Sequence, residues 1–297
     1  MLIVITTLLY NNSTIQQFNN KIYMESKLKL AILDMYEGTK NLGMTNIQDI
    51  VKRFKADLDF EIFDVRSEVR VPDLSHDIYI FSGGPGNPLV GDETWLQPFH
   101  DLIDELWEHN LSDEGPKKYV FFICHSFQMA CHHFGLGEIN RRRKKSFGTF
   151  PVHKTEDGER EWLFSLLDEP FWVADFREYQ VVQPNLERFE EIGAKLLCIE
   201  KDRPHLEMER AMMAVRFSPE MIGTQFHPEA DPVGMREYFA EPERVVAILE
   251  EYGKEKYDNM VTHLHDPNKI ARTHATILPL FLADSIRRVR AGALELV

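Results

Sequence analysis

The sequence predicts an α/β domain built on a mainly parallel central sheet. Continuous apolar runs of strand length alternate with amphipathic runs of helix length, and glycine-rich or polar loops separate them. Strands that alternate with helices form crossover units, and these units place neighbouring strands parallel. We expect this pattern from residue 28 to about residue 134.

The elements of this first half follow from local patterns. The apolar runs predict strands over residues 28–35, 60–65, 77–81 and 119–123. A helix is expected near residues 45–55, and another begins directly after Cys124 and runs to about residue 134. Residues 94–109 form a third helix, because their large apolar side chains recur at helical spacing.

The pattern changes after Gly137. Shorter β-like runs cover residues 146–152, 171–182, 194–200, 210–217 and 221–226, and we interpret them as a small antiparallel excursion from the main sheet. A helix is predicted over residues 233–252. The remaining residues read as further helix, interrupted near Pro267 and Pro279.

These patterns divide the chain into three parts. Residues 1–27 are expected to be an N-terminal tail that does not contribute to the fold, residues 28–252 the main domain, and residues 253–297 a C-terminal helical extension. The first ten residues are apolar but lack a basic leader and a cleavage site of small residues, so we do not expect a signal peptide. Residues 1–23 are interpreted as an accessory tail or an over-long start before Met24.

Composition excludes several classes of function. With 34 basic and 48 acidic residues the formal charge is −14, which argues against sequence-independent binding of nucleic acid. No apolar run approaches the roughly 20 residues that span a bilayer, so no membrane partner is expected. Three cysteines in 297 residues do not make a disulfide framework. They favour a reducing compartment and hence a cytoplasmic protein.

The sharpest chemical feature is Cys124, which stands at the end of an apolar strand and directly before a helix. A nucleophile at such a turn projects from the carboxyl edge of the sheet. The helix N-terminus also favours a thiolate. On local sequence alone, a buried structural cysteine is an equally good interpretation.

Two further segments follow predicted strands. The segment GTQFHPE at residues 223–229 places His227 and Glu229 on either side of a proline, so that a carboxylate is near an imidazole that can act as a base. A surface turn is the simpler alternative. The loop SGGPGNP at residues 82–88 can present backbone N–H groups to an oxyanion, or it can be an ordinary tight turn. It lacks the ending of a phosphate-binding P-loop.

The order of these segments closely resembles that of the class I glutamine amidotransferases, over about residues 28–250. The resemblance implies a flavodoxin-like, three-layer α/β/α fold. It also implies that Cys124 attacks a glutamine side-chain amide, that His227 relays protons and that Glu229 orients His227. The remaining implied residues are the oxyanion-hole amides of Gly84 and His125 and the substrate-binding residues Gly83, Gln128 and Glu178.

The sequence departs from the family pattern at two places. The turn around the nucleophile usually has glycine two residues before and two residues after the cysteine, where this chain has Phe122 and Ser126. The bulky Phe122 needs space from the neighbouring strands. A His-x-Asp element that helps grip glutamine is also altered, since residues 175–184 lack the histidine and place Glu178 near the aspartate position.

Other polar clusters are weaker candidates. Residues 131–133 and 263–266 contain histidines, but neither has the spacing of a complete metal-ligand set, so no metal is expected. No cofactor is expected either. The basic run at residues 141–145 is interpreted as a solvated turn or as a contact for an acidic partner or an anionic substrate.

We therefore expect a glutaminase that releases ammonia through a cysteine thioester. The residues after 252 are too few for a synthetase domain, so the ammonia is expected to pass to a separate acceptor synthase. The C-terminal helices are candidates for covering the site or forming a homo-oligomer. The same thiol also suits an acyltransferase, as in the homoserine acyltransferases, or a γ-glutamyl hydrolase. A non-catalytic binding protein of this fold is a further alternative.

Overall fold

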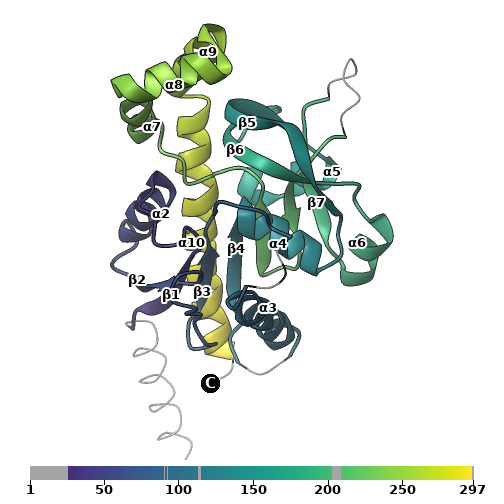
Figure 1. Ribbon diagram of the computed structural model, residues 1–297. Helices are drawn as coiled ribbons and strands as arrows, with labels where there is room; N and C mark the ends of the chain where they lie inside the picture. The colour runs from purple at the N-terminus through teal and green to yellow at the C-terminus, as the bar shows by residue number, and fades with distance from the viewer. Residues whose placement is uncertain (1–25, 90, 92, 113–114, 203–208, 296–297) are drawn as a thin grey trace, which may run out of the picture.

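The computed structural model describes residues 26–89, 91, 93–112, 115–202 and 209–295, and nearly all of the predicted tail 1–27 lies outside them. The described chain forms a nine-stranded sheet in the order β2-β1-β3-β4-β9-β8-β7-β5-β6 (Figure 1). The parallel part contains β1 (Leu28–Asp34), β2 (Leu58–Asp64), β3 (Ile78–Phe81), β4 (Tyr119–Ile123) and β9 (Met221–Thr224).

The other half of the sheet is antiparallel, so the expectation of a mainly parallel sheet with a small excursion was wrong. The remaining strands are β5 (Glu138–Lys154), β6 (Phe171–Val182), β7 (Lys195–Glu200) and β8 (Met212–Arg216). All four pairings from β9 outward to β6 are antiparallel. The strands after residue 137 lack long crossover helices between them, and strands joined without crossovers pair antiparallel. They extend the same sheet, which is therefore mixed.

Helices cover both faces of the parallel part. The helices α2 (Leu42–Lys52) and α10 (Ile270–Glu295) share one apolar cluster with β1, whose Leu30 and Ile32 point to that face. The helices α3 (Leu96–Leu111) and α4 (His125–His133) share a second cluster with Ala31 and Leu33 of the same strand. Alternate side chains of a strand point to opposite faces, so β1 contributes to both layers of the core.

The C-terminal segment consists of several helices. The residues predicted as one helix over 233–252 form α7 (Pro232–Phe239) and α8 (Pro242–Tyr252), because Pro242 begins a new helix. Next come α9 (Lys254–His265) and α10, which continues through Pro279 where an interruption was predicted. Figure 1 shows α7, α8 and α9 together at one end of α10.

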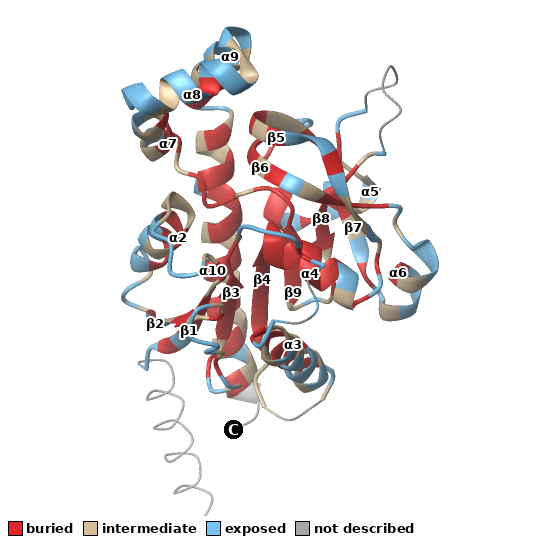
Figure 2. Ribbon diagram, in the orientation of Figure 1, coloured by how far each residue is buried: buried red, intermediate tan, exposed pale blue. Residues whose placement is uncertain are grey.

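The apolar residues of α7 to α9 form a third cluster with Phe147 of β5 and Phe176 of β6. Figure 2 shows α10 largely buried along the sheet and α8 largely exposed. The division at residue 252 and a homo-oligomer through these helices stay predictions. Three short helices that were not predicted connect the antiparallel strands: α5 (Glu156–Arg160), the 3-10 helix η1 (Trp162–Phe164) and α6 (Leu186–Ile192).

Candidate active site

The strand-to-helix turn at Cys124 has a strained backbone. Cys124 follows the last residue of β4 and caps α4 with φ 49° and ψ −95°, in a region that side chains other than glycine rarely adopt. Its N–H donates to the carbonyl of Thr224 on β9 (2.8 Å). Although the residue is only 5% exposed, it lines two adjoining cavities. The thiol is therefore reachable, unlike that of a purely structural cysteine.

Two elements hold His227 beside this thiol. Its backbone N–H donates to the carbonyl of Ala174 on β6 (2.9 Å), and its Nδ1 hydrogen-bonds Glu229 Oε1 (2.7 Å). Nε2 is then the ring nitrogen that can form the hydrogen bond to the Cys124 side chain. The Glu229 side chain is 1% exposed. The backbone carbonyl of Glu229 accepts a hydrogen bond from Nδ1 of His274 on α10 (3.0 Å).

The electrostatics of this pair favour a charged imidazole. Burial by itself lowers the pKa of His227, but the negative charges of Glu229 and Cys124 and the hydrogen bonds to both residues outweigh it. The pKa of His227 is therefore raised well above its ordinary value. A protonated imidazole beside a sulfur is the arrangement that activates a cysteine nucleophile.

The glycine loop after β3 lies directly against these residues. A Cβ added at Gly83 would lie 3.0 Å from His227 Cε1 and 2.9 Å from the Tyr36 hydroxyl, so only glycine allows this close approach. At Gly84 an added Cβ would lie 2.6 Å from the carbonyl oxygen of Met35. Gly83 was predicted as a substrate-binding residue, and the structure puts it against the imidazole.

The two predicted oxyanion-hole amides line the smaller cavity together. Gly84 and His125 both border this cavity of about 130 Å³, as does Cys124. None of the described residues accepts a hydrogen bond from either amide. Two unpaired N–H groups beside a nucleophile can bind the negative oxygen of a tetrahedral intermediate.

An arginine with a buried side chain, which no sequence motif indicated, links this loop to α4. Arg66 donates from Nη2 to His125 Nε2 (2.7 Å) and from Nη1 to the carbonyl of Pro85 (2.8 Å). Burial and the Arg66 charge lower the pKa of His125 to about 3, so this imidazole is neutral and accepts the bond. Arg66 therefore fixes both segments that carry the unpaired amides.

The predicted substrate residues Gln128 and Glu178 line the smaller cavity as well. Gln128 Nε2 donates to the carbonyl of Tyr179 (2.8 Å) and to Gln225 Oε1 (3.1 Å). Gln225 Nε2 in turn donates to Cys124 Sγ (3.7 Å), so Gln225 is a further contact of the nucleophile. Glu178 is exposed and forms ion pairs with Lys145 Nζ (3.5 Å) and Arg141 Nη2 (3.4 Å).

The structure also accounts for the two substitutions at the turn. Phe122 pairs with Gly223 on β9, where an added Cβ would lie 3.0 Å from Phe122 Cβ and 2.8 Å from Phe127 Cδ2. Gly223 thus provides the space that Phe122 needs. The Ser126 hydroxyl donates to the carbonyl of Phe81 (2.9 Å) and accepts from the N–H of Ile123 (2.9 Å), which ties α4 to β3 and β4.

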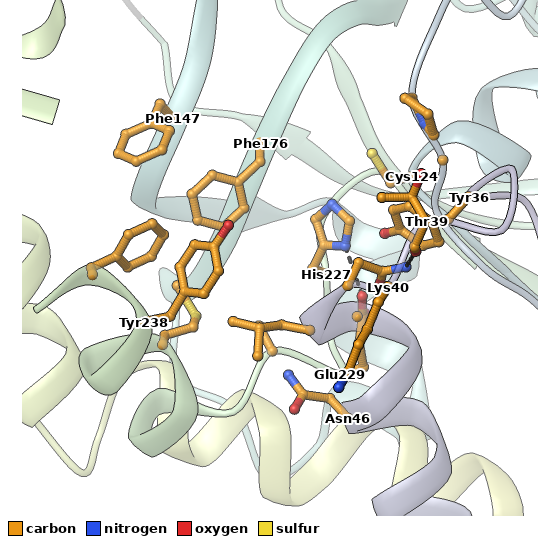
Figure 3. A pocket seen from close by; sticks show the side chains of 18 of the residues that line it. Tyr36, Thr39, Lys40, Asn46, Cys124, Phe147, Phe176, His227, Glu229 and Tyr238 are labelled. Carbon is orange, nitrogen blue, oxygen red and sulfur yellow. Dashed lines mark hydrogen bonds and ion pairs between the residues drawn. The ribbon is translucent and has the colours of Figure 1, made fainter. Parts of the chain in front are cut away.

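Tyr36 is a further site residue that the motifs did not indicate. It follows β1, and the pKa of its phenol is raised well above 10 by burial and by the negative charges of Glu229, Cys124 and Asp34. The phenol is therefore neutral and keeps its proton. Its hydroxyl has no hydrogen-bond partner among the described residues and borders the larger cavity (Figure 3). A position at the carboxyl end of a parallel strand was the only available indication.

Of the weaker candidates, the basic run reaches the site, because Lys145 borders both cavities. Within the described ranges, no group of three or more His, Cys, Asp and Glu side chains is arranged to hold a metal. His263 instead pairs with the hydroxyl of Thr149 (2.7 Å). Residues 141–145 belong to β5 and do not form a turn; Arg142 there is buried against Glu200. No helix in the described part of the chain is long and apolar enough to cross a membrane.

Comparison with known proteins now decides the family. The model of the family described as glutamine amidotransferase class-I matches residues 34–241, which include Cys124, His227 and Glu229. The chain belongs to this family. Among curated proteins, no sequence matches the chain.

Solved structures of glutamine amidotransferases share the fold. A glutamine amidotransferase from Thermotoga maritima superposes with a TM-score of 0.64 at 15% identity, over 88% of this chain and 99% of that one. A glutamine amidotransferase from Methylobacillus flagellatus gives a TM-score of 0.58 at 16% identity, over 89% and 97% of the two chains. At such identities the likeness concerns the fold alone.

Proposed function

We propose that the protein is a cysteine amidohydrolase that releases ammonia from glutamine through a thioester on Cys124 and supplies it to a separate acceptor enzyme. The observation that carries the proposal is the convergence of Cys124, His227 and Glu229 beside two unpaired amides. Membership in the glutamine amidotransferase family supports glutamine as the substrate.

The reaction follows from the positions of these groups. The Cys124 thiolate attacks the side-chain amide carbon, and the amides of Gly84 and His125 bind the resulting oxyanion. Loss of one such donor typically costs about 10²–10³ in rate. His227 gives its proton to the leaving nitrogen, the C–N bond breaks and ammonia departs. Water, deprotonated by His227, then hydrolyses the thioester to glutamate.

The smaller cavity fits the glutamyl part of this substrate. Gln128 and the residues of the two oxyanion amides border it, and the carboxylate of Glu178 can pair with the substrate's α-ammonium group. Gly83 allows His227 to approach the reacting carbon closely. We propose these residues as the substrate-binding set.

Ammonia release from glutamine tests the proposal directly. We expect glutamate and ammonia in equal amounts from the intact chain, with the rate reduced at least about 10³-fold in Cys124→Ala. Cys131→Ala is the matched control. Cys131 lies on α4 and is fully buried in the protein core, and burial raises its thiol pKa well above the usual value. Equal ammonia release by the wild type and Cys124→Ala would contradict the proposal.

A further inference from the structure

Two cavities meet at Cys124, and the larger one has no role in holding glutamine. The smaller cavity, of about 130 Å³, carries the unpaired amides and Gln128. The larger one, of about 520 Å³, is bordered by His227, Glu229 and Tyr36. The two cavities adjoin and share Gly84 and Cys124, but His125 and Gln128 border only the smaller one, whereas His227 borders only the larger one.

The positions of the oxyanion donors and of the proton donor assign the larger cavity to the leaving group. The acyl carbon must lie where the oxyanion donors reach its oxygen, which places the glutamyl part in the smaller cavity. The leaving nitrogen must lie within reach of His227, which protonates it. Any substituent on that nitrogen therefore projects into the larger cavity.

The larger cavity is unsuited to ammonia as its sole occupant. Ammonia is about the size of water, whose share of liquid volume is roughly 30 Å³. A space of about 520 Å³ falls in the range of small-molecule sites. Its surface is mostly apolar, and Phe147 of β5, Phe176 of β6 and Tyr238 of α7 face the triad across it (Figure 3). Three basic residues also border the cavity: Lys40, Lys145 and Arg244.

The described chain itself holds this wall in place. The Phe147 ring stacks on Tyr252 of α8 (4.4 Å between centroids) and lies 5.6 Å from the Phe239 ring of α7. Phe176 lies 6.2 Å from the His227 ring, so the aromatic surface continues to the imidazole. The Tyr238 ring is covered by the Arg244 guanidinium at 3.4 Å, which fixes its position.

We propose that this cavity binds the aromatic amine of a γ-glutamyl amide, so that the preferred substrate is an N-aryl or N-arylalkyl glutamine. The inference rests on the proposed function. Cys124 Sγ bonds to the γ-carbonyl carbon, the C–N bond breaks, and the proton of His227 passes to the nitrogen of the departing amine. Water then cleaves the thioester, giving glutamate and the free aromatic amine.

The test compares γ-glutamyl phenethylamide with glutamine as substrates of the intact chain. We expect kcat/KM to be at least about tenfold higher for the aromatic amide, because the apolar cavity binds its ring. Tyr238→Ala is expected to lower the ratio of the two kcat/KM values about tenfold. Trp162→Ala, which truncates an exposed aromatic side chain that does not border the cavity, is the matched control and should leave the ratio unchanged.

Direct binding provides a second measurement that does not depend on the variants being active. Phenethylamine should bind to the Cys124→Ala protein in calorimetry and should compete with the aromatic amide in the wild type. Hydrolysis of glutamine with no preference for the aromatic amide, and no binding of phenethylamine, would overturn the inference while the proposed function stands. The cavity would then be free for a partner's segment. Absence of acylation of Cys124 by either amide would refute the proposed function itself.

Discussion

Replacing Glu229 with glutamine tests the electrostatic basis of the site. The carboxylate is nearly fully buried and lies 2.7 Å from His227 Nδ1, so solvent screens the interaction little. An opposite charge at this distance typically raises the pKa of its partner by about 1–3 units, which corresponds to about 1.4–4 kcal/mol. Glu229→Gln removes the charge but keeps an oxygen that accepts from Nδ1. We therefore expect the pKa of His227 to fall by about 1–3 units.

The sign of the effect on activity follows from the active ion pair. His227 must be protonated while Cys124 is a thiolate, and this state is lost as pH rises through the pKa of His227. The basic limb of the kcat/KM profile should therefore move to lower pH by about 1–3 units in Glu229→Gln. Glu191→Gln, an exposed surface change, is the control. A basic limb at the same pH in Glu229→Gln and wild type would mean that the Glu229 charge does not raise the pKa of His227.

Three further substitutions test the geometry of the site. Gly83→Ala places a methyl group 3.0 Å from His227 Cε1, and a displaced imidazole should lower kcat/KM about 10–100-fold with little change in Tm. Arg66→Met removes the donor shared by the glycine loop and α4, so steady-state kinetics should show a kcat at least about tenfold lower. Gly223→Ala overpacks the two phenylalanines it faces, which should cost about 1–3 kcal/mol and lower the calorimetric Tm by several degrees.

For each of these three substitutions, one experimental outcome would contradict the predicted effect. Unchanged kcat/KM in Gly83→Ala would mean that the loop can move away without displacing His227. Wild-type kcat in Arg66→Met would mean that the two amides keep their positions without the guanidinium. An unchanged Tm in Gly223→Ala would mean that the neighbouring strand has room for a side chain.

The sequence pointed to the three side chains of the proposed triad because each belongs to a segment that ends a strand. Cys124 and His227 could be placed at one edge of the sheet from strand order and motif alone, and the structure brings them together. Arg66 and Tyr36 could not be found in this way. Their contacts arise only when the loops after β1 and β2 fold against the glycine loop, and no local pattern records that packing.

The errors in the predicted fold have physical causes too. The periodicity of residues 138–217 predicts strands but does not say whether they extend the main sheet or form a separate one. Pro279 was expected to interrupt a helix, yet α10 continues through it. The apolar side chains around it, Leu278 and Leu282, are fully buried in the core, and this packing outweighs the lost hydrogen bond. The space for Phe122 depends on its register against Gly223, which only the paired strands reveal.

Covalent trapping shows whether Cys124 is a reactive nucleophile. The intact chain would be treated with a diazoketone analogue of glutamine, and its mass and modified peptide would be determined. We expect one label, on Cys124, and none on Cys131 or Cys198, since both of these thiols are fully buried and burial raises their pKa well above the usual value. An unlabelled Cys124, or equal labelling of the three cysteines, would contradict this expectation.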